Sequence, residues 1–189
     1  TAVPIAPDLT AGAGVLPTAK ELQSTGQLSV FSFGQGSFTA TPLQITAMMN
    51  TIAAGGTYRT PRFCCGVTDA DGTVTEKFQL PAPRTVCDAA TAKVLRSMLQ
   101  SVVEDGIGYA AKPTGGTAAG KTGTAQTGQF DAAGDELLNY WFSGFIPAGD
   151  PQYTITVLQD GVLEPETSSA AIFAQIAAGL QVIEQSTPD

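Results

Sequence analysis

Apolar residues recur at the three- and four-residue spacing of an amphipathic helix in three stretches of the chain. The first stretch follows Thr41, which can cap a helix, and Pro42, which suits the first helical position. It ends at Gly55-Gly56, a common stop signal. Its expected buried face consists of Ile45, Met48, Met49 and Ile52.

The other two helical stretches lie further along the chain. One begins at Asp88, a second potential cap, and ends near Gly106. Its expected apolar face is Leu95, Met98, Leu99 and Val102. The last begins after Ser168 or Ser169, either of which can cap it. Its expected buried stripe is Ile172, Ile176, Leu180 and Ile183.

Other segments have the composition of strands. Residues 62–68 and 73–78 flank an Asp71-Gly72 turn and predict a hairpin. Three further strand-like segments are 117–126, 140–146 and 153–159, of which the last alternates and is rich in β-branched residues. A short connection rich in Pro, Gly and Asp joins the last two, so we expect them to pair antiparallel.

The remaining segments have no clear period. Residues 1–30 and 107–117 are expected to be largely irregular, and residues 127–139 are expected to form a Gly-rich loop that covers part of the site. Helices that alternate with antiparallel strands predict an α+β fold, in which helices pack against one antiparallel sheet.

Composition narrows the classes of function. The chain has 189 residues and a net charge of −8, and its nine Lys and Arg residues are scattered, which excludes phosphate-backbone binding to nucleic acid. No apolar run reaches the ~20 residues of a membrane span, so we expect no membrane contact by this segment. Without His or a CxxC pair, no structural zinc site is expected. Cys87 could pair with Cys64 or Cys65, or all three could be free thiols.

The chemistry is concentrated in Lys121-Thr122-Gly123-Thr124. On a strand, Lys121 and Gly123 face one way and Thr122 and Thr124 the other. An ammonium beside hydroxyl groups can hold a carboxylate, and Gly123 lets a ligand approach the backbone closely. Free N–H groups of an edge strand can pair with an extended peptide or stabilise an oxyanion.

A second motif overlaps this one. Gly115, Gly120, Lys121 and Thr122 satisfy the G-x-x-x-x-G-K-T pattern of a phosphate-binding loop. That loop requires an apolar strand before it and a helix after it. The preceding residues 110–114 are not strand-like, and Gly123 and Gly128 disfavour a helix start. Nucleotide binding is therefore the weaker alternative.

Several blocks together resemble the penicillin-binding transpeptidase family, most closely its class B, high-molecular-mass members. The blocks are GVLP at 14–17, GQGSFTATPLQ at 34–44, VVEDGIGYAAK at 102–112, AGKTGTAQ at 119–126 and WFSGFIP at 141–147. Their order and spacing fit the family from about residue 9 to residue 180. The resemblance implies a partial β-lactamase/transpeptidase-like fold, with residues 1–189 as the C-terminal part of one such domain.

The resemblance also implies roles for individual residues. The family uses three motifs, S-x-x-K, S-x-N and K-T-G, and Lys121-Thr122-Gly123 matches the third. Lys121 would support the site electrostatically, and the Thr122 and Thr124 hydroxyls would bind the terminal carboxylate of a stem peptide or a β-lactam. The Thr124 N–H would be one of two oxyanion donors. Gly34-Gln35-Gly36 would be structural, near the active-site floor.

The first two family motifs are absent from the 189 residues. No Ser stands three positions before any of the five lysines, and none stands two positions before Asn50 or Asn139. In the family both motifs precede the GQG block, so we expect this chain to be a segment of a longer protein and the sheet to lack its opening strands, which leaves an exposed edge. By itself the segment would be inactive.

The resemblance therefore implies a peptidoglycan D,D-transpeptidase that is acylated by β-lactams and uses no metal or cofactor. Its partners would be stem peptides, β-lactams and the N-terminal half of its own domain. The parent protein would be anchored at the extracytoplasmic face of a bacterial membrane by a segment not present here. The alternative is a non-catalytic module or sensor of the same fold that binds peptide or penicillin.

Overall fold

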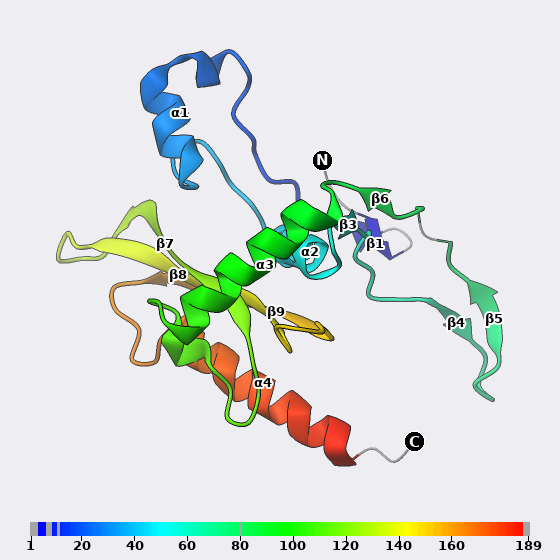
Figure 1. Ribbon diagram of the computed structural model, residues 1–189. Coiled ribbons are helices and arrows are strands. Elements are labelled where there is room, and N and C mark those ends of the chain that lie inside the picture. The colour runs from blue at the N-terminus through cyan, green and yellow to red at the C-terminus, as the bar shows by residue number, and fades with distance from the viewer. Residues whose placement is uncertain (1–3, 7–8, 11, 80, 187–189) are drawn as a thin grey trace.

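The computed structural model describes residues 4–6, 9–10, 12–79 and 81–186, and an antiparallel sheet lies at its centre (Figure 1). The three strands have the order β7-β8-β9, with bounds β7 (Ala119–Phe130), β8 (Glu136–Ile146) and β9 (Tyr153–Val162). Both β7 and β9 are therefore edge strands within the described residues. The antiparallel pairing predicted for the last two strands is confirmed.

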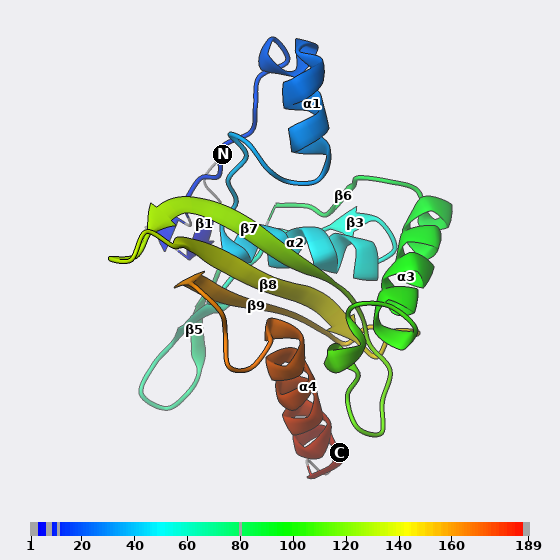
Figure 2. The same ribbon diagram turned by 90° about the vertical axis from the view of Figure 1, so that its left-hand side faces the viewer.

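Three helices pack around this sheet: α2 (Pro42–Ala53), α3 (Ala89–Glu104) and α4 (Ser169–Ser186). Helices α2 and α4 contact strands β8 and β9, and α3 contacts β7 (Figure 2). Helices packed against one antiparallel sheet are the predicted α+β arrangement, which the structure confirms.

Alternate residues of β8 enter two separate hydrophobic clusters. Phe142 packs against Phe173 of α4, with ring centroids 4.7 Å apart, and both side chains are fully buried. Phe145 instead packs with Met49 and Ala53 of α2. Since successive side chains of a strand point to opposite faces, α2 and α4 cover opposite faces of the sheet. The sheet is thus the middle of three layers.

The helix starts are set by side-chain caps, as the sequence predicts. Thr41 and Gln44 form a capping box, in which Thr41 Oγ1 accepts from the Gln44 N–H at 3.2 Å. Asp88 caps α3 by accepting from the Thr91 N–H at 2.6 Å. Ser168 caps α4, because its hydroxyl oxygen accepts from the Ala171 N–H at 3.2 Å. Each cap satisfies an N–H that has no partner inside its helix.

The predicted apolar faces of the helices are only partly right. Met49 is buried, but the exposed fractions of Met48, Met98 and Ile176 are 51%, 61% and 43%. The buried positions are mostly small residues: Ala47 and Ala53 in α2, Ala92 in α3, and Ala170 and Ala177 beside Phe173 in α4. Small side chains let a helix approach the sheet closely, so the buried stripe follows Ala rather than the large aliphatic residues.

Smaller elements surround this core. They are β1 (Pro4–Ala6), β2 (Leu9–Thr10), η1 (Glu21–Gln23), α1 (Thr25–Ser32), β3 (Thr57–Tyr58), β4 (Gly66–Thr68), β5 (Val74–Lys77), β6 (Arg84–Thr85) and η2 (Tyr109–Ala111). The β4–β5 hairpin confirms the prediction with shorter strands, and it extends away from the sheet in Figure 1. Helix α1 was not predicted, because its eight residues are too few to establish a period.

Residues 127–139 are not the loop that the Gly content suggested. β7 runs to Phe130 and β8 starts at Glu136, so most of the segment is paired strand. The Thr127 hydroxyl donates to the Leu137 carbonyl at the point where the register shifts. The Asp131 carboxylate accepts from the Ala133 and Asp135 N–H groups, each at 2.9 Å, which closes the turn. The strand pairing thus overrides the local turn signal.

Candidate functional site

Strand β7 presents the Lys121–Thr124 motif along the edge of the sheet. In the register of the β7–β8 ladder, Lys121 lies opposite Ser143 and Gly123 opposite Trp141. Thr122 lies opposite Phe142, whose ring packs against α4. Because cross-strand partners share a face, Lys121 and Gly123 belong to the α2 side of the sheet and Thr122 to the α4 side. The predicted alternation of the motif agrees with this register.

The backbone of the motif offers polar groups at the free edge of β7. The Thr124 carbonyl accepts from the Gln35 side-chain amide at 3.5 Å, and the Thr122 carbonyl accepts from Lys121 Nζ at 3.1 Å. Both carbonyls therefore point away from β8. In an antiparallel strand the N–H and C=O of one residue point to the same side. The N–H groups of Thr122 and Thr124 consequently lie at the free edge as well.

A groove of about 670 Å³ runs along this edge. One wall is residues 121–127 of β7, and the opposite wall is residues 33–36 together with Ile45 and Met48 of α2. Gly34 and Gly36 have φ values of +81° and +88°, which favour glycine and let the segment turn beside β7. The structure thus brings the GQG block and the Lys-Thr-Gly motif to the same groove. Gln35 and Thr124, which are in contact there, are 89 positions apart in the sequence.

Lys121 supplies the positive charge of the groove. Its ammonium nitrogen lies 3.2 Å from Thr122 Oγ1, and the side chain is exposed. An ammonium and a hydroxyl held this close form a pair of donors for one anionic group. Gly123 packs closely against the neighbouring strand, since a Cβ there would lie 3.3 Å from Trp141 Cβ. The arrangement can bind a carboxylate at an edge that also accepts an extended peptide.

Behind the groove lies a chain of hydroxyl groups that no sequence motif predicts. Ser143, which lines the groove opposite Lys121, is only 4% exposed. Its hydroxyl lies 2.7 Å from that of Thr156, and Thr46 of α2 donates to Thr156 at 2.7 Å. The Thr46 hydroxyl is also 2.8 Å from the Pro42 carbonyl. This chain fixes α2 to β8 and β9 beneath the motif strand. The only indication of this chain in the sequence is that Ser143 and Thr156 are polar residues within two otherwise apolar strands.

The phosphate-loop alternative is wrong. Lys121 lies inside a strand whose ladder runs from Ala119 to Phe130, and the next element is strand β8 rather than a helix. A phosphate-binding loop requires a helix N-terminus at that position.

Within the described ranges, no group of three His, Cys, Asp or Glu side chains could hold a metal ion. Cys64, Cys65 and Cys87 are free thiols. None of the described helices has the length and apolar character that crossing a membrane requires.

Comparison with known proteins identifies the family. The family model described as the penicillin binding protein transpeptidase domain matches residues 10–178. Penicillin-binding protein PbpB of Mycolicibacterium smegmatis is 37% identical over 183 residues, which cover 88% of this chain and 28% of that protein. Stage V sporulation protein D of Bacillus subtilis is 34% identical, over 79% of this chain and 23% of its own length. The chain thus spans less than a third of the length of these curated relatives.

A solved structure agrees with these matches. The apo crystal structure of penicillin binding protein 3 from Mycobacterium tuberculosis aligns with a TM-score of 0.79 and 31% identity. The alignment covers 94% of this chain and 42% of that one. The arrangement of helices and sheet described above is therefore that of a penicillin-binding transpeptidase domain.

Proposed function

The chain belongs to the penicillin-binding protein transpeptidase family, and on that premise we propose that residues 1–189 are the substrate-holding part of a peptidoglycan D,D-transpeptidase domain. The observation that carries the proposal is the groove beside β7. There the Lys121 ammonium, the Thr122 hydroxyl and the edge N–H of Thr124 converge within four consecutive residues.

Each motif residue has a role in this proposal. Thr122 and Thr124 bind the terminal carboxylate of an acyl-D-Ala-D-Ala stem peptide, or the equivalent group of a β-lactam, and Lys121 balances its charge. Gly123 keeps the edge open for the peptide backbone. The Thr124 N–H is one donor of an oxyanion hole. Loss of one such donor typically slows acyl transfer about a hundredfold or more.

The serine nucleophile lies outside this chain in the proposal, since the 189 residues contain neither S-x-x-K nor S-x-N. In the complete enzyme that serine attacks the acyl-D-Ala-D-Ala carbonyl and D-Ala leaves. The acyl group then passes to an amine on a neighbouring strand. The complete protein would work at the extracytoplasmic face of a bacterial membrane, where peptidoglycan lies, anchored by another segment of its chain.

A titration of the isotope-labelled chain tests the substrate role. We expect an acyl-D-Ala-D-Ala peptide to shift the backbone amide resonances of residues 121–126, and the same peptide with a C-terminal amide to bind at least about fivefold more weakly. Equal binding of the acid and the amide would contradict carboxylate recognition. Shifts confined to other parts of the chain would place the peptide elsewhere.

A labelling experiment separates the enzyme segment from the alternative, a non-catalytic binding module. We expect no covalent adduct when this chain is incubated with a fluorescent penicillin, because it has no S-x-x-K serine. A longer form of the protein that carries the nucleophile should form a stoichiometric, denaturation-resistant adduct. If no form is labelled while the D-Ala-D-Ala peptide still binds, the non-catalytic module is the correct function.

A further inference from the structure

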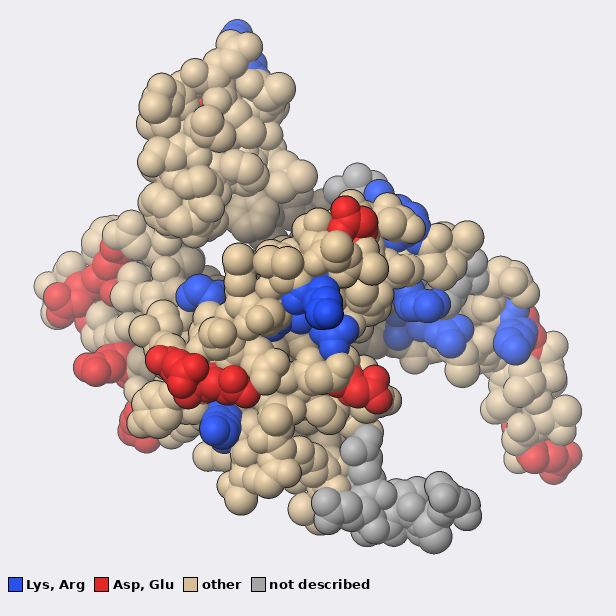
Figure 3. All heavy atoms as spheres, viewed as in Figure 1, with Lys and Arg blue, Asp and Glu red and all other residues tan. Residues whose placement is uncertain are grey.

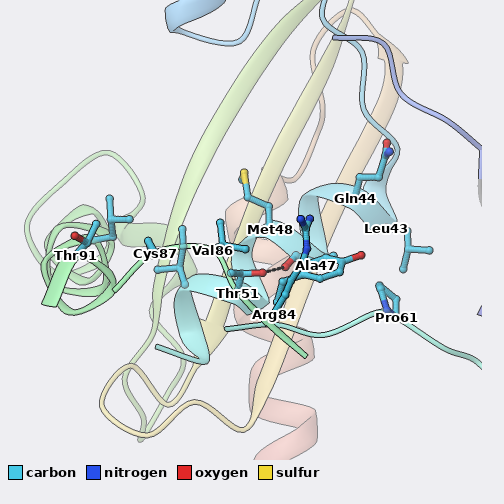
Figure 4. Close-up of a pocket in the computed structure, with 13 residues that line it drawn as sticks. Leu43, Gln44, Ala47, Met48, Thr51, Pro61, Arg84, Val86, Cys87 and Thr91 are labelled. Carbon is cyan, nitrogen blue, oxygen red and sulfur yellow. Dashed lines mark hydrogen bonds between the residues drawn. The ribbon is translucent and has the colours of Figure 1, made fainter. Parts of the chain in front are cut away.

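A second cavity lies on the other side of α2 from the motif groove. It has a volume of about 510 Å³ and lies between α2, the start of α3 and the paired strands β3 and β6 (Figure 4). Its apolar walls come from Leu43 and Ala47 of α2, Val86 beside β6, and Leu95 of α3. The volume falls in the range of sites for small organic molecules.

The turn after α2 creates this cavity. Gly55-Gly56 ends the helix, and the Gly56 carbonyl accepts from the Val86 N–H at 2.8 Å. A Cβ on Gly56 would lie 2.2 Å from the Cys87 carbonyl oxygen, and the φ of Gly56 is +93°. Only glycine permits this approach. This close approach holds Val86 and Cys87 beside the end of α2. These two residues form the wall of the cavity that faces α2.

One cation stands at this apolar cavity. Arg84 of β6 lines it (Figure 4). Its guanidinium carbon lies 5.0 Å from the centroid of the Tyr58 ring, which also lines the cavity. Stacking on an aromatic ring holds a guanidinium while its N–H groups stay available. Arg84 makes no ion pair with any residue in the part of the chain that the structure describes.

Arg84, rather than the wider surface, supplies the charge that favours an anion here. The chain has a net charge of −8, but residues 59–84 carry four of its nine cations (Arg59, Arg62, Lys77 and Arg84) against three of its seventeen carboxylates (Asp69, Asp71 and Glu76). Figure 3 shows blue side chains gathered between α3 and the β4–β5 hairpin, while red side chains mark the far end of the hairpin. This stretch is therefore not acidic, unlike the chain as a whole, and Arg84 is the charged side chain that lines the cavity.

We propose that this cavity binds a small organic anion with an apolar body, such as a medium-chain carboxylate. The apolar body lies against Leu43, Ala47 and Val86, and the carboxylate is bound by Arg84 at the rim. Gln44 and Thr91 add neutral polar groups to the lining, and the nearby Asp88 carboxylate is bound by the Thr91 N–H in the cap of α3. Met48 lines this cavity and the motif groove alike, so a bound ligand also contacts a residue of the groove.

Cys87 provides the measurement, because its half-buried thiol lines the cavity. In a Cys64→Ser/Cys65→Ser background it is the sole thiol, and its alkylation by iodoacetamide can be followed by mass spectrometry. We expect saturating octanoate to slow alkylation at least about fivefold. Octanol, which has the same chain length without the charge, should need about a fivefold higher concentration for half-maximal protection.

Substitutions at Arg84 test the charge. Arg84→Gln should raise the half-maximal octanoate concentration to that of octanol, and Arg84→Lys should retain the preference for octanoate. Arg62→Gln is the matched control, since Arg62 lies in the same basic segment but does not line the cavity. Thermal unfolding of each variant confirms that it is folded.

Two results would overturn the proposal. One is the absence of octanoate protection in the folded protein, and the other is an unchanged octanoate preference in folded Arg84→Gln. Neither measurement involves the motif groove, so both outcomes are independent of D-Ala-D-Ala or penicillin binding.

Discussion

The hydroxyl oxygens of Thr46 and Thr156 lie 2.7 Å apart and join α2 to β9 across 110 residues of sequence. Thr156 also lies 2.7 Å from the Ser143 hydroxyl, which lines the motif groove. Position 156 is thus the centre of the polar contact between α2 and the sheet, beneath the strand that presents Lys121. This contact explains how an apolar sheet face tolerates the Ser143 and Thr156 hydroxyl groups, since each has a hydrogen-bond partner.

Thr156→Val should therefore lower the free energy of unfolding by about 1–2 kcal/mol, because it leaves the buried Ser143 hydroxyl and Thr46 without this partner. Valine conserves the shape, so the loss reports hydrogen bonding rather than packing. Urea unfolding measures it. Thr73→Val, in the exposed β4–β5 hairpin, is the control and should change stability little. Equal unfolding midpoints for wild type and Thr156→Val would contradict the role of the hydroxyl chain.

Two glycine substitutions should have opposite effects. A Cβ on Gly120 would lie 2.6 Å from the Phe142 ring and 2.8 Å from the Ser143 carbonyl oxygen. Gly120→Ala should cost about 1–3 kcal/mol, because β7 or Phe142 must shift. Gly179 lies in α4 with open space around it, so Gly179→Ala should stabilise the chain by about 0.5–1 kcal/mol. Thermal unfolding of the pair measures both, and changes of the same sign would contradict the packing described for β7.

The substrate proposal predicts that a substitution at Thr122 weakens the binding of a peptide only when that peptide ends in a carboxylate. Thr122→Val removes the hydroxyl beside Lys121 Nζ and should weaken acyl-D-Ala-D-Ala binding about fivefold, the effect of one lost hydrogen bond. It should leave binding of the C-terminal amide peptide unchanged, since that ligand has no carboxylate. Isothermal titration with both peptides provides the comparison. Equal weakening of both would assign Thr122 a structural role.

The cap of α3 predicts a dependence of stability on pH. The Thr91 backbone N–H holds the pKa of Asp88 below its ordinary value of 3.8, so folding favours the charged carboxylate. That contribution is present above the unfolded pKa and is lost as the pH falls through the lower, folded pKa. In Asp88→Asn the amide oxygen still caps the helix but does not titrate.

The stability advantage of wild type over Asp88→Asn should consequently shrink when the pH is lowered from about 5 to about 2. Unfolding experiments at several pH values measure this difference. Glu21, whose pKa is lowered by the Thr18 backbone N–H, contributes in the same direction to both proteins and cancels in the comparison. A difference that grows on acidification would show that Asp88 does not act as a charged cap.

Local signals in the sequence were sufficient for most elements. Thr41-Pro42, Asp88 and Ser168 start their helices where predicted, because a cap depends only on residues within one turn. Residues 153–159 form most of β9, since β-branched residues favour a pleated surface. The motif blocks and the absence of S-x-x-K can be read from the amino-acid sequence alone.

Other features depend on distant parts of the chain. The exposure of Met48 and Ile176 could not be predicted, because the buried face of a helix is decided by which side chains let it approach the sheet. The strand structure of residues 127–139 required the β7–β8 register. The contact between Gln35 and Thr124, the Thr46–Thr156–Ser143 chain and the cavity at Arg84 join segments that are far apart in sequence.

Residue types and short spacings were sufficient to identify the family, the helix starts and Lys121–Thr124 as the candidate site. The packing of the folded chain, in contrast, sets the edge position of β7, with the Thr122 and Thr124 N–H groups turned outward. It also decided that GQG forms the opposite wall and that a separate cavity lies across α2. The physical reason is that grooves and strand edges exist only between elements, and packing sets their relative positions.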